Sequence, residues 1–303
     1  MSFAKHQTFH IRDGWLRKGM VAVKNDPGIF LSEKAPEQLG LGVNMVGALR
    51  FWMVATGLTE EEYENRRRVQ HLTHFGKRVL EYDEYLEEDG TLWLIHYHLA
   101  KNPAEATTWY WFFNHFAKLV FDKEQFVSEL DFWIRQTESK EISRRSLERD
   151  FDCFLRTYLP SDRASSPEDT IECPLSALEL LSADNTKDQK QKTYRFLRPS
   201  VARFHPLIAL YVIKRWQEEE RFNAPQITFG DVLRIPANAG RVFNLDASSL
   251  SELFGRLNEE HPDFAVRLTR TEGLDTLSLP NVPSEEILDA YYERQSMEVA
   301  LAI

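Results

Sequence analysis

Cysteine is nearly absent from this chain of 303 residues, which has only Cys153 and Cys173. The two lie outside CxxC spacing and have no neighbouring histidine, so the sequence predicts neither a zinc site nor a structural disulfide, and we expect two buried thiols. The chain also lacks an apolar run of about 18 residues and a charged-then-apolar leader with a cleavage site. We therefore expect a cytoplasmic protein that does not contact a membrane.

Familiar catalytic motifs are missing as well. There is no glycine-rich phosphate loop, no GxSxG elbow and no visible Cys-His dyad, so neither ATP use nor thiol chemistry is indicated. A metal-dependent nuclease needs clustered carboxylates. The glutamate-rich run at residues 60–64 is interpreted as the solvated start of a helix, and Glu138-Ser139-Lys140 holds only half of a restriction-type motif. No ligand set for a metal is evident.

Charged and aromatic side chains are concentrated at the amino end instead. The first 80 residues hold 12 Lys+Arg against 8 Asp+Glu, although the whole chain has a formal net charge of -10. Phe3, Phe9 and Trp15 are suited to docking a terminal segment onto the body of a protein, which would hold the ionisable groups near them in place. Those groups are His6, His10, Arg12, Asp13, Arg17 and Lys18. We expect the cations among them to converge on one groove that holds duplex DNA; the alternative is ordinary scatter on a solvated surface.

Apolar periodicity predicts a mainly α fold with small β-hairpins. Helices are expected at residues 15–23, near residue 37, at 44–56 and at 204–216, and the segments 92–99 and 108–116 are expected in the core. A helix capped by Asp246 is followed by a hairpin, which is the winged-helix order. We expect tandem helix-turn-helix or winged-helix units at 120–160 and 225–282, with a further one near the amino end.

Polar, turn-rich segments at 160–172 and 183–193 mark loops or linkers. They divide the chain into an N-terminal helical domain with a basic first segment (1–118), a central helix-turn-helix unit (119–182) and a C-terminal winged-helix-like domain (195–303). Residues 183–194 are the expected polar linker or loop.

The central unit carries the clearest amphipathic pattern. Ser143 is a good N-cap, and the helix after it places Arg145 and Arg149, as well as Arg156, away from its apolar stripe; of these, Arg145 and Arg149 are candidates for DNA contact. Arg144 and Arg145 fall in the first turn, where a recognition helix meets nucleic acid, so Arg144, Arg145 and Arg149 are predicted to bind DNA. The alternative is a solvated face with internal Glu/Arg pairs.

Six sequence runs carry a family resemblance: FAKHQTFHIRDGWLRKG, LGLGVNMVGALRFW, GTLWLIHYHLA, TTWYWFFN, RDFDCFLRTY and ECPLSALELL. In this order they resemble a bacterial family known only as a domain of unknown function, which includes SspB, the nickase of the single-strand DNA phosphorothioation (Ssp) antiphage system. The resemblance extends from Phe3 to about Leu279. The family pattern has a lysine where this chain has Val43.

The resemblance implies a protein that binds and nicks DNA so that sulfur can enter the backbone. The implied partners are DNA, a cysteine desulfurase, an ATPase and a reductase-like sulfur transferase, and the implied cofactor is a divalent metal, Mg²⁺ or Mn²⁺. The other reading is a non-catalytic DNA-binding adaptor that docks the sulfur-transfer machinery. A transcriptional regulator would instead require a defined operator.

Site roles follow from the residue types in the matching runs. We predict proton transfer at the scissile phosphate by His6, His10 or Asp13, because a histidine near its ordinary pKa suits that task at neutral pH. Local capping by the histidines and an Arg12–Asp13 pair are the structural alternatives. The residues predicted to contact DNA in the amino-terminal region are Arg12, Arg17, Lys18, Asn44, Arg50, Arg66, Arg67 and Arg68.

Overall fold

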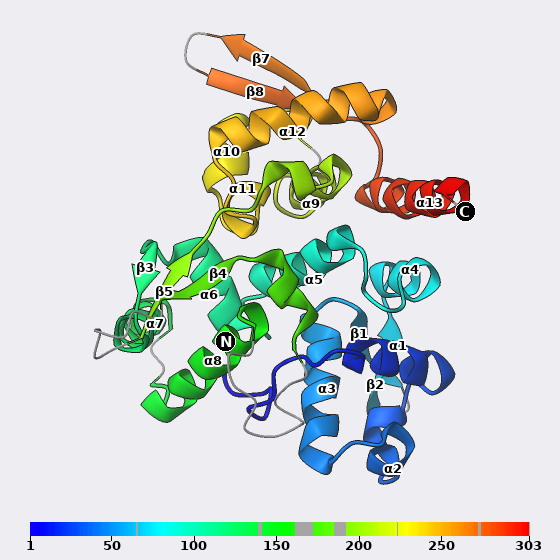
Figure 1. Ribbon diagram of the computed structural model, residues 1–303, viewed down its shortest axis with the longest axis vertical. Helices are drawn as coiled ribbons and strands as arrows, with labels where there is room; N and C mark the ends of the chain where they lie inside the picture. Colours follow the sequence, from blue (N-terminus) through cyan, green and yellow to red (C-terminus); the bar gives the residue numbers. More distant parts are fainter. Residues whose placement is uncertain are drawn as a thin grey trace.

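The computed structural model describes residues 1–64, 66–138, 141–160, 172–184, 192–222, 224–271 and 274–302, and in this part of the chain it is mostly helical with small antiparallel sheets (Figure 1). The predicted class, mainly α with small hairpins, is confirmed. Among the described residues, no helix combines the length and the apolarity needed to cross a membrane.

The first region surrounds a buried helix. Its elements are α1 (Trp15–Asn25), η1 (Ile29–Leu31), α2 (Ala35–Leu39), α3 (Val43–Ala55), β1 (Thr59–Glu64), β2 (Arg67–Leu72) and α4 (His74–Tyr82). Gly40 ends α2 with φ 60°, a left-handed conformation that glycine adopts without strain. α1 crosses α3 closely at Gly19. A Cβ at this position would lie 2.4 Å from the Met53 sulfur, so the absence of a side chain at Gly19 allows the two helices to approach.

The middle region is packed with aromatic rings. Its elements are α5 (Asp89–Lys101), α6 (Thr107–His115), β3 (Val120–Phe121), α7 (Lys123–Thr137), α8 (Arg144–Tyr158), η3 (Pro174–Leu178), β4 (Leu181–Asp184) and β5 (Thr193–Phe196). Phe112 packs with Phe126 and Phe154 at ring-centroid distances of 5.8 and 4.6 Å. The helix pair α7 and α8 starts from Asp122 and Ser143, which cap it through side-chain oxygens.

The last region places a three-stranded sheet beside helices. Its elements are η4 (Val201–Arg203), α9 (Pro206–Glu220), β6 (Ile227–Thr228), α10 (Phe229–Arg234), α11 (Ala239–Val242), α12 (Ala247–Glu260), η5 (Pro262–Phe264), β7 (Arg267–Thr271), β8 (Leu274–Ser278) and α13 (Ser284–Ala302). The sheet order is β6-β8-β7, and β7 and β8 form the predicted hairpin; residues 272–273 between them lie outside the described residues.

α13 joins this last region to the first one (Figure 1). Asp289 accepts hydrogen bonds from His74 Nε2 and Arg78 Nε of α4, both at 2.7 Å. One buried apolar cluster runs through all three regions. The division into three domains therefore stays a prediction.

The structure differs from the sequence analysis at two places. Residues 60–64 were expected to start a helix, and this is wrong, because they form β1 of a hairpin with β2. Asp184 and Thr193, at the edges of the expected linker, are paired in β4 and β5, and residues 185–191 between them lie outside the described part.

Candidate functional site

The first residues dock onto α6 and α8 through one buried carboxylate. Asp150, in α8, accepts hydrogen bonds from the Ala4 backbone N–H at 2.7 Å and from His6 Nε2 at 3.0 Å, both on Oδ1. Its Oδ2 accepts from the Thr108 hydroxyl at 2.6 Å. The side chains of His6 and Asp150 are 1% and 2% exposed. The expectation that the amino end is held in place is therefore met, and polar as well as aromatic contacts hold it.

Both ring nitrogens of His6 have partners inside the protein. The Thr8 backbone N–H donates to Nδ1 at 3.1 Å, so Nδ1 accepts and Nε2 donates to Asp150. The ring stacks on Trp52 at 6.0 Å, and the Trp52 Nε1–H donates to the Phe9 carbonyl at 2.9 Å. Because both nitrogens are engaged inside the protein, His6 offers neither to a phosphate in this structure, and its predicted catalytic role stays a prediction.

The next ionisable residues are also largely covered. His10 is 7% exposed and Arg12 is 6% exposed. The Arg12 guanidinium lies 5.5 Å from the Phe9 ring centroid and 5.4 Å from that of Trp15. Contact of either side chain with DNA would require movement of this segment.

Three of the predicted residues come together in a cavity of about 900 Å³ beside α1. Asp13, Arg17 and Lys18 line it, together with residues of α2 and of the segment after α4. The Arg17 Nε donates to Glu84 at 3.0 Å and its guanidinium lies 4.6 Å over the Tyr85 ring. The Lys18 Nζ donates to the Leu39 carbonyl at 2.8 Å. We call this space the α1 cavity.

One face of the β1–β2 hairpin gathers two more predicted residues. Arg50 of α3 donates to Glu61 Oε1 from Nε at 3.0 Å and from Nη2 at 2.8 Å. Arg68 donates to the other Glu61 oxygen at 3.2 Å and to the Tyr63 hydroxyl at 2.9 Å. The hydroxyl and ring of Tyr63 and the charge of Glu61 raise the pKa of Arg68, which therefore stays charged. Two arginines on one carboxylate leave a net positive charge at this face.

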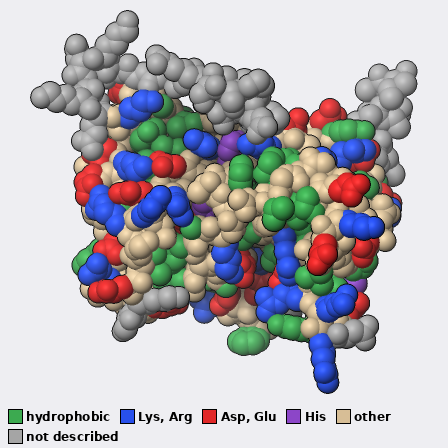
Figure 2. All heavy atoms as spheres, turned by 90° about the horizontal axis from the view of Figure 1, so that it is seen from below, with side chains coloured by type: hydrophobic (Ala, Val, Ile, Leu, Met, Phe, Trp, Pro, Cys, Tyr) green, Lys and Arg blue, Asp and Glu red, His purple; other side chains and the backbone are tan. Residues whose placement is uncertain are grey.

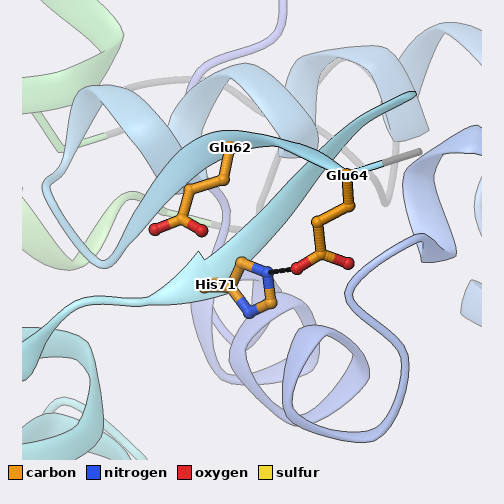
Figure 3. Close-up of side chains that lie close together, drawn as sticks. All are labelled: Glu62, Glu64 and His71. Carbon is orange, nitrogen blue, oxygen red and sulfur yellow. Dashed lines mark hydrogen bonds and ion pairs between the residues drawn. The ribbon is translucent and has the colours of Figure 1, made fainter. Parts of the chain in front are cut away.

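The other face of the hairpin carries a metal-donor set that the sequence analysis missed. Glu62 and Glu64 project from β1 and His71 from β2, with their ligand atoms all within 4.8 Å of one another (Figure 3). His71 Nε2 lies 2.7 Å from Glu64 Oε1. Alternation in the strand places residues 62 and 64 on the same face, and the antiparallel register puts residue 71 opposite residue 60, on that face and diagonal to residue 62. The Glu-x-Glu spacing was the available signal, and it was hidden by the helical interpretation.

α8 carries the third group of predicted residues. Arg144 pairs with Glu124 and with Glu148, the latter at 3.0 Å, so it fits the structural alternative of internal pairs. Arg145 and Arg149 are exposed, and no ion pair or hydrogen bond of their side chains is found in the part of the chain described. Arg156, which was placed on this face by the sequence but not predicted to contact DNA, lies there at helical spacing and is exposed.

The predicted cations fall into three groups on different elements. Arg17 and Lys18 lie at the α1 cavity, Arg50 and residues 66–68 at the hairpin, and Arg144, Arg145 and Arg149 on α8. Figure 2 shows basic and acidic side chains interspersed over the face it presents. Asn44 is exposed at the start of α3, next to Val43, which is 75% exposed. Convergence of the three groups on one DNA duplex stays a prediction.

Comparison with known proteins gives the family. The model of the family described as protein of unknown function (DUF4007) matches residues 3–292. A magnesium ion-bound SspB crystal structure has a TM-score of 0.87 and 27% identity, covering 96% of this chain and 88% of that chain. A second SspB crystal structure has a TM-score of 0.84 with the same identity and coverage. Among curated proteins, none matches the sequence. The chain therefore belongs to the DUF4007 family, and the predicted membership of a family of unknown function that includes SspB is confirmed.

Proposed function

We propose that this protein binds and nicks DNA in a phosphorothioation system, with the β1–β2 hairpin as the nicking centre. One observation carries the proposal: a metal-donor set and exposed arginines lie on the same small element. Arg67 lies opposite Glu64 in the hairpin register, and Arg66 and Arg67 are both exposed. Phosphodiester hydrolysis needs a metal to activate water and cations to neutralise the phosphate, so this pairing suits the reaction.

The donor set favours some metals over others. Glu62, Glu64 and His71 supply two carboxylates and one imidazole, and imidazole suits Mn²⁺ or a later transition metal better than Mg²⁺, which prefers oxygen. The magnesium in an SspB structure supports a divalent ion in the family. When bound, such an ion would lower the pKa of a water molecule and polarise the phosphate. Arg66 and Arg67 would hold the phosphate near it.

Proton transfer by His6, His10 or Asp13 remains part of the proposal, and their placement favours one of them. Asp13 is exposed at the α1 cavity, whereas the two histidines are 1% and 7% exposed. His6 and His10 would then act by holding the segment that carries Asp13, and not at the phosphate itself.

Two further surfaces would hold the duplex. Arg145, Arg149 and Arg156 form a row along α8 about 16 Å long, from the helical rise per residue. In the last region, the order of helices before β7 and β8, with β6 paired to β8, supports a winged-helix unit. Its α12 exposes Glu252 and Glu259, so we propose that the exposed Arg267 and Arg270 of β7 face the phosphates.

Removal of the two hairpin carboxylates is expected to abolish nicking. The double change Glu62→Gln and Glu64→Gln keeps the strand but lowers the charge of the donor set, so the rate of open-circle formation from supercoiled plasmid should fall at least about 100-fold. The assay is run with Mn²⁺ and with Mg²⁺, and Mn²⁺ should support the faster reaction. Glu37→Gln on α2, also exposed, is the matched control and should nick normally. An unchanged rate in the double variant would place the centre elsewhere.

The same assay distinguishes the alternative function. If the purified protein retards DNA in gels but leaves the plasmid intact with either metal, the adaptor function holds. It would then bind DNA and dock the cysteine desulfurase, ATPase and reductase-like components without cutting.

The α8 arginines are expected to set DNA affinity. Arg145→Gln with Arg149→Gln removes two exposed charges, so affinity should drop about 10-fold or more in dilute salt and the slope of log K against log salt should decrease by about 2. Arg135→Gln is the control, because Arg135 is exposed on α7 but paired with Asp131 at 2.9 Å. An unaltered salt slope in the α8 variant would show that this row does not meet phosphates.

A further inference from the structure

We propose that the α1 cavity binds a nucleobase together with its phosphate, and that in the DNA-binding protein this is a base unstacked from the strand. The DNA source of the base rests on the proposed function, whereas the cavity chemistry does not. Four properties of the cavity support the proposal: an aromatic platform, an apolar floor, amide groups and a pair of cations.

The platform is Tyr85, which is 60% exposed although it lines the cavity. The Arg17 guanidinium lies 4.6 Å from its ring centroid, and Arg17 Nε is anchored by Glu84 at 3.0 Å. An exposed tyrosine normally moves freely, but this contact orients the ring. Nucleobases stack on tyrosine rings and on guanidinium planes, so the pair presents two stacking surfaces at one wall.

The floor is apolar and the wall has amide groups. Ile29 and Leu39 are buried residues that line the cavity, and Asn25 and Gln38 are exposed residues that line it as well. An apolar floor with a few hydrogen-bonding groups is typical of small-molecule sites, and the volume of about 900 Å³ lies in the range of such sites. Carboxamides pair with base edges through one donor and one acceptor.

The charged residues that line the α1 cavity favour a single nucleobase over a stretch of DNA backbone as its occupant. The lining includes Asp13, Asp26 and Glu87 as well as Arg17 and Lys18. Three carboxylates would repel a run of phosphates passing through the cavity, but they accept hydrogen bonds from the amino or ring N–H groups of bases. Two cations on consecutive positions of α1 are enough for the single phosphate attached to one base.

The test uses a single-stranded oligonucleotide with one 5-iodouracil, which crosslinks under light to an aromatic ring stacked on it. We expect the crosslink at Tyr85, its retention in Tyr85→Phe and its loss in Tyr85→Ala, with oligonucleotide affinity about 10-fold lower in the alanine variant. Phe222→Ala, which removes an aromatic side chain that is 90% exposed, is the control and should crosslink like the original protein.

Thymidine monophosphate alone provides the second arm. If the oligonucleotide is not retained but the mononucleotide raises the melting temperature, and Tyr85→Ala removes this effect, the cavity takes a free nucleotide and the DNA-binding proposal fails. If the oligonucleotide is retained and its crosslinks lie only on α8 or the hairpin, the nucleobase inference is overturned and the proposed function stands. If neither probe binds, both are overturned.

Discussion

Asp150→Ala is expected to lower the free energy of unfolding by about 3–5 kcal/mol, the cost of breaking a buried polar network by removing one partner. The change leaves the Ala4 N–H, the His6 Nε2–H and the Thr108 hydroxyl without their common acceptor. The Asp150 carboxylate is 2% exposed, so water cannot easily take its place. The measurement is chemical denaturation followed by tryptophan fluorescence.

Asp152→Ala is the matched control on the same helix. Its side chain is 55% exposed and pairs with Lys123 at 2.8 Å, a surface contact that contributes about 1 kcal/mol or less.

A further variant, His6→Ala, tests the role of His6. If His6→Ala destabilises the protein and nicking is lost only in proportion to the unfolded fraction, His6 holds the segment. A folded His6→Ala protein with no nicking would support the catalytic prediction instead.

The amino end illustrates what the sequence can and cannot predict. Its aromatic residues indicated a docked segment, and Trp15 is indeed buried while the Phe9 carbonyl accepts from Trp52. Asp150, which organises the segment, lies 144 positions from His6. Helical spacing places Asp150 on the apolar stripe with Leu147 and Phe154, but the local pattern does not identify its partners at the amino end. Pairings at such a distance depend on how the helices pack.

The hairpin was missed because local composition favoured the wrong element. A run of glutamates is common at the start of a helix, whereas β1 is stable because its charges are matched across the strands. Glu64 lies opposite Arg67 and Glu61 reaches Arg68, so the basic run and the acidic run compensate each other. The sequence analysis predicted that the arginines at 66–68 contact DNA. It could not connect them with Glu62 and His71, because the pairing of β1 with β2 was unknown. The metal-donor set could only be found from the register.

The α1 cavity lies between these cases. Asp13, Arg17 and Lys18 were predicted as site residues, and all three line the cavity. Arg17 and Lys18 lie one helical turn after Gly14, the N-cap of α1, so local helix geometry is enough to place them together. The rest of the lining includes Leu39, which ends α2, and Tyr85, which follows α4. A site between elements is therefore visible in the sequence from one side only.

Acid is expected to destabilise the protein from about pH 6.5 downward, before most carboxylates are protonated. His96 is fully buried, with Nε2 donating to the Val242 carbonyl and Nδ1 accepting from the Tyr158 hydroxyl, both at 2.8 Å. Burial lowers the pKa of His96 from 6.5 to about 4. Burial also lowers the pKa of His205 to about 4, with the charge of His261 adding to the effect. Both histidines are therefore neutral in the folded protein at pH 5 but protonated in the unfolded chain.

The sign of the effect follows from proton binding. Between pH 6.5 and 4 the unfolded chain binds more protons, so stability is fully present above the unfolded pKa of 6.5 and is lost as pH falls towards 4. The shift of His96 alone corresponds to about 3 kcal/mol, which is a large part of the stability of an ordinary protein. Urea denaturation at pH 8, 7, 6 and 5 should give little change over the first step and a steep loss over the last two.

His96→Gln isolates the contribution of this histidine. The amide keeps a donor and an acceptor but does not titrate, so the variant should be less stable than the original protein at pH 7 because of altered packing, yet lose less stability between pH 6.5 and 5. The measurement is the slope of the unfolding free energy against pH, which gives the number of protons taken up on unfolding. This number should be lower in the variant than in the original protein by nearly one proton. Identical slopes would mean that His96 is solvated or already protonated in the folded protein, contrary to its place between α8 and α11.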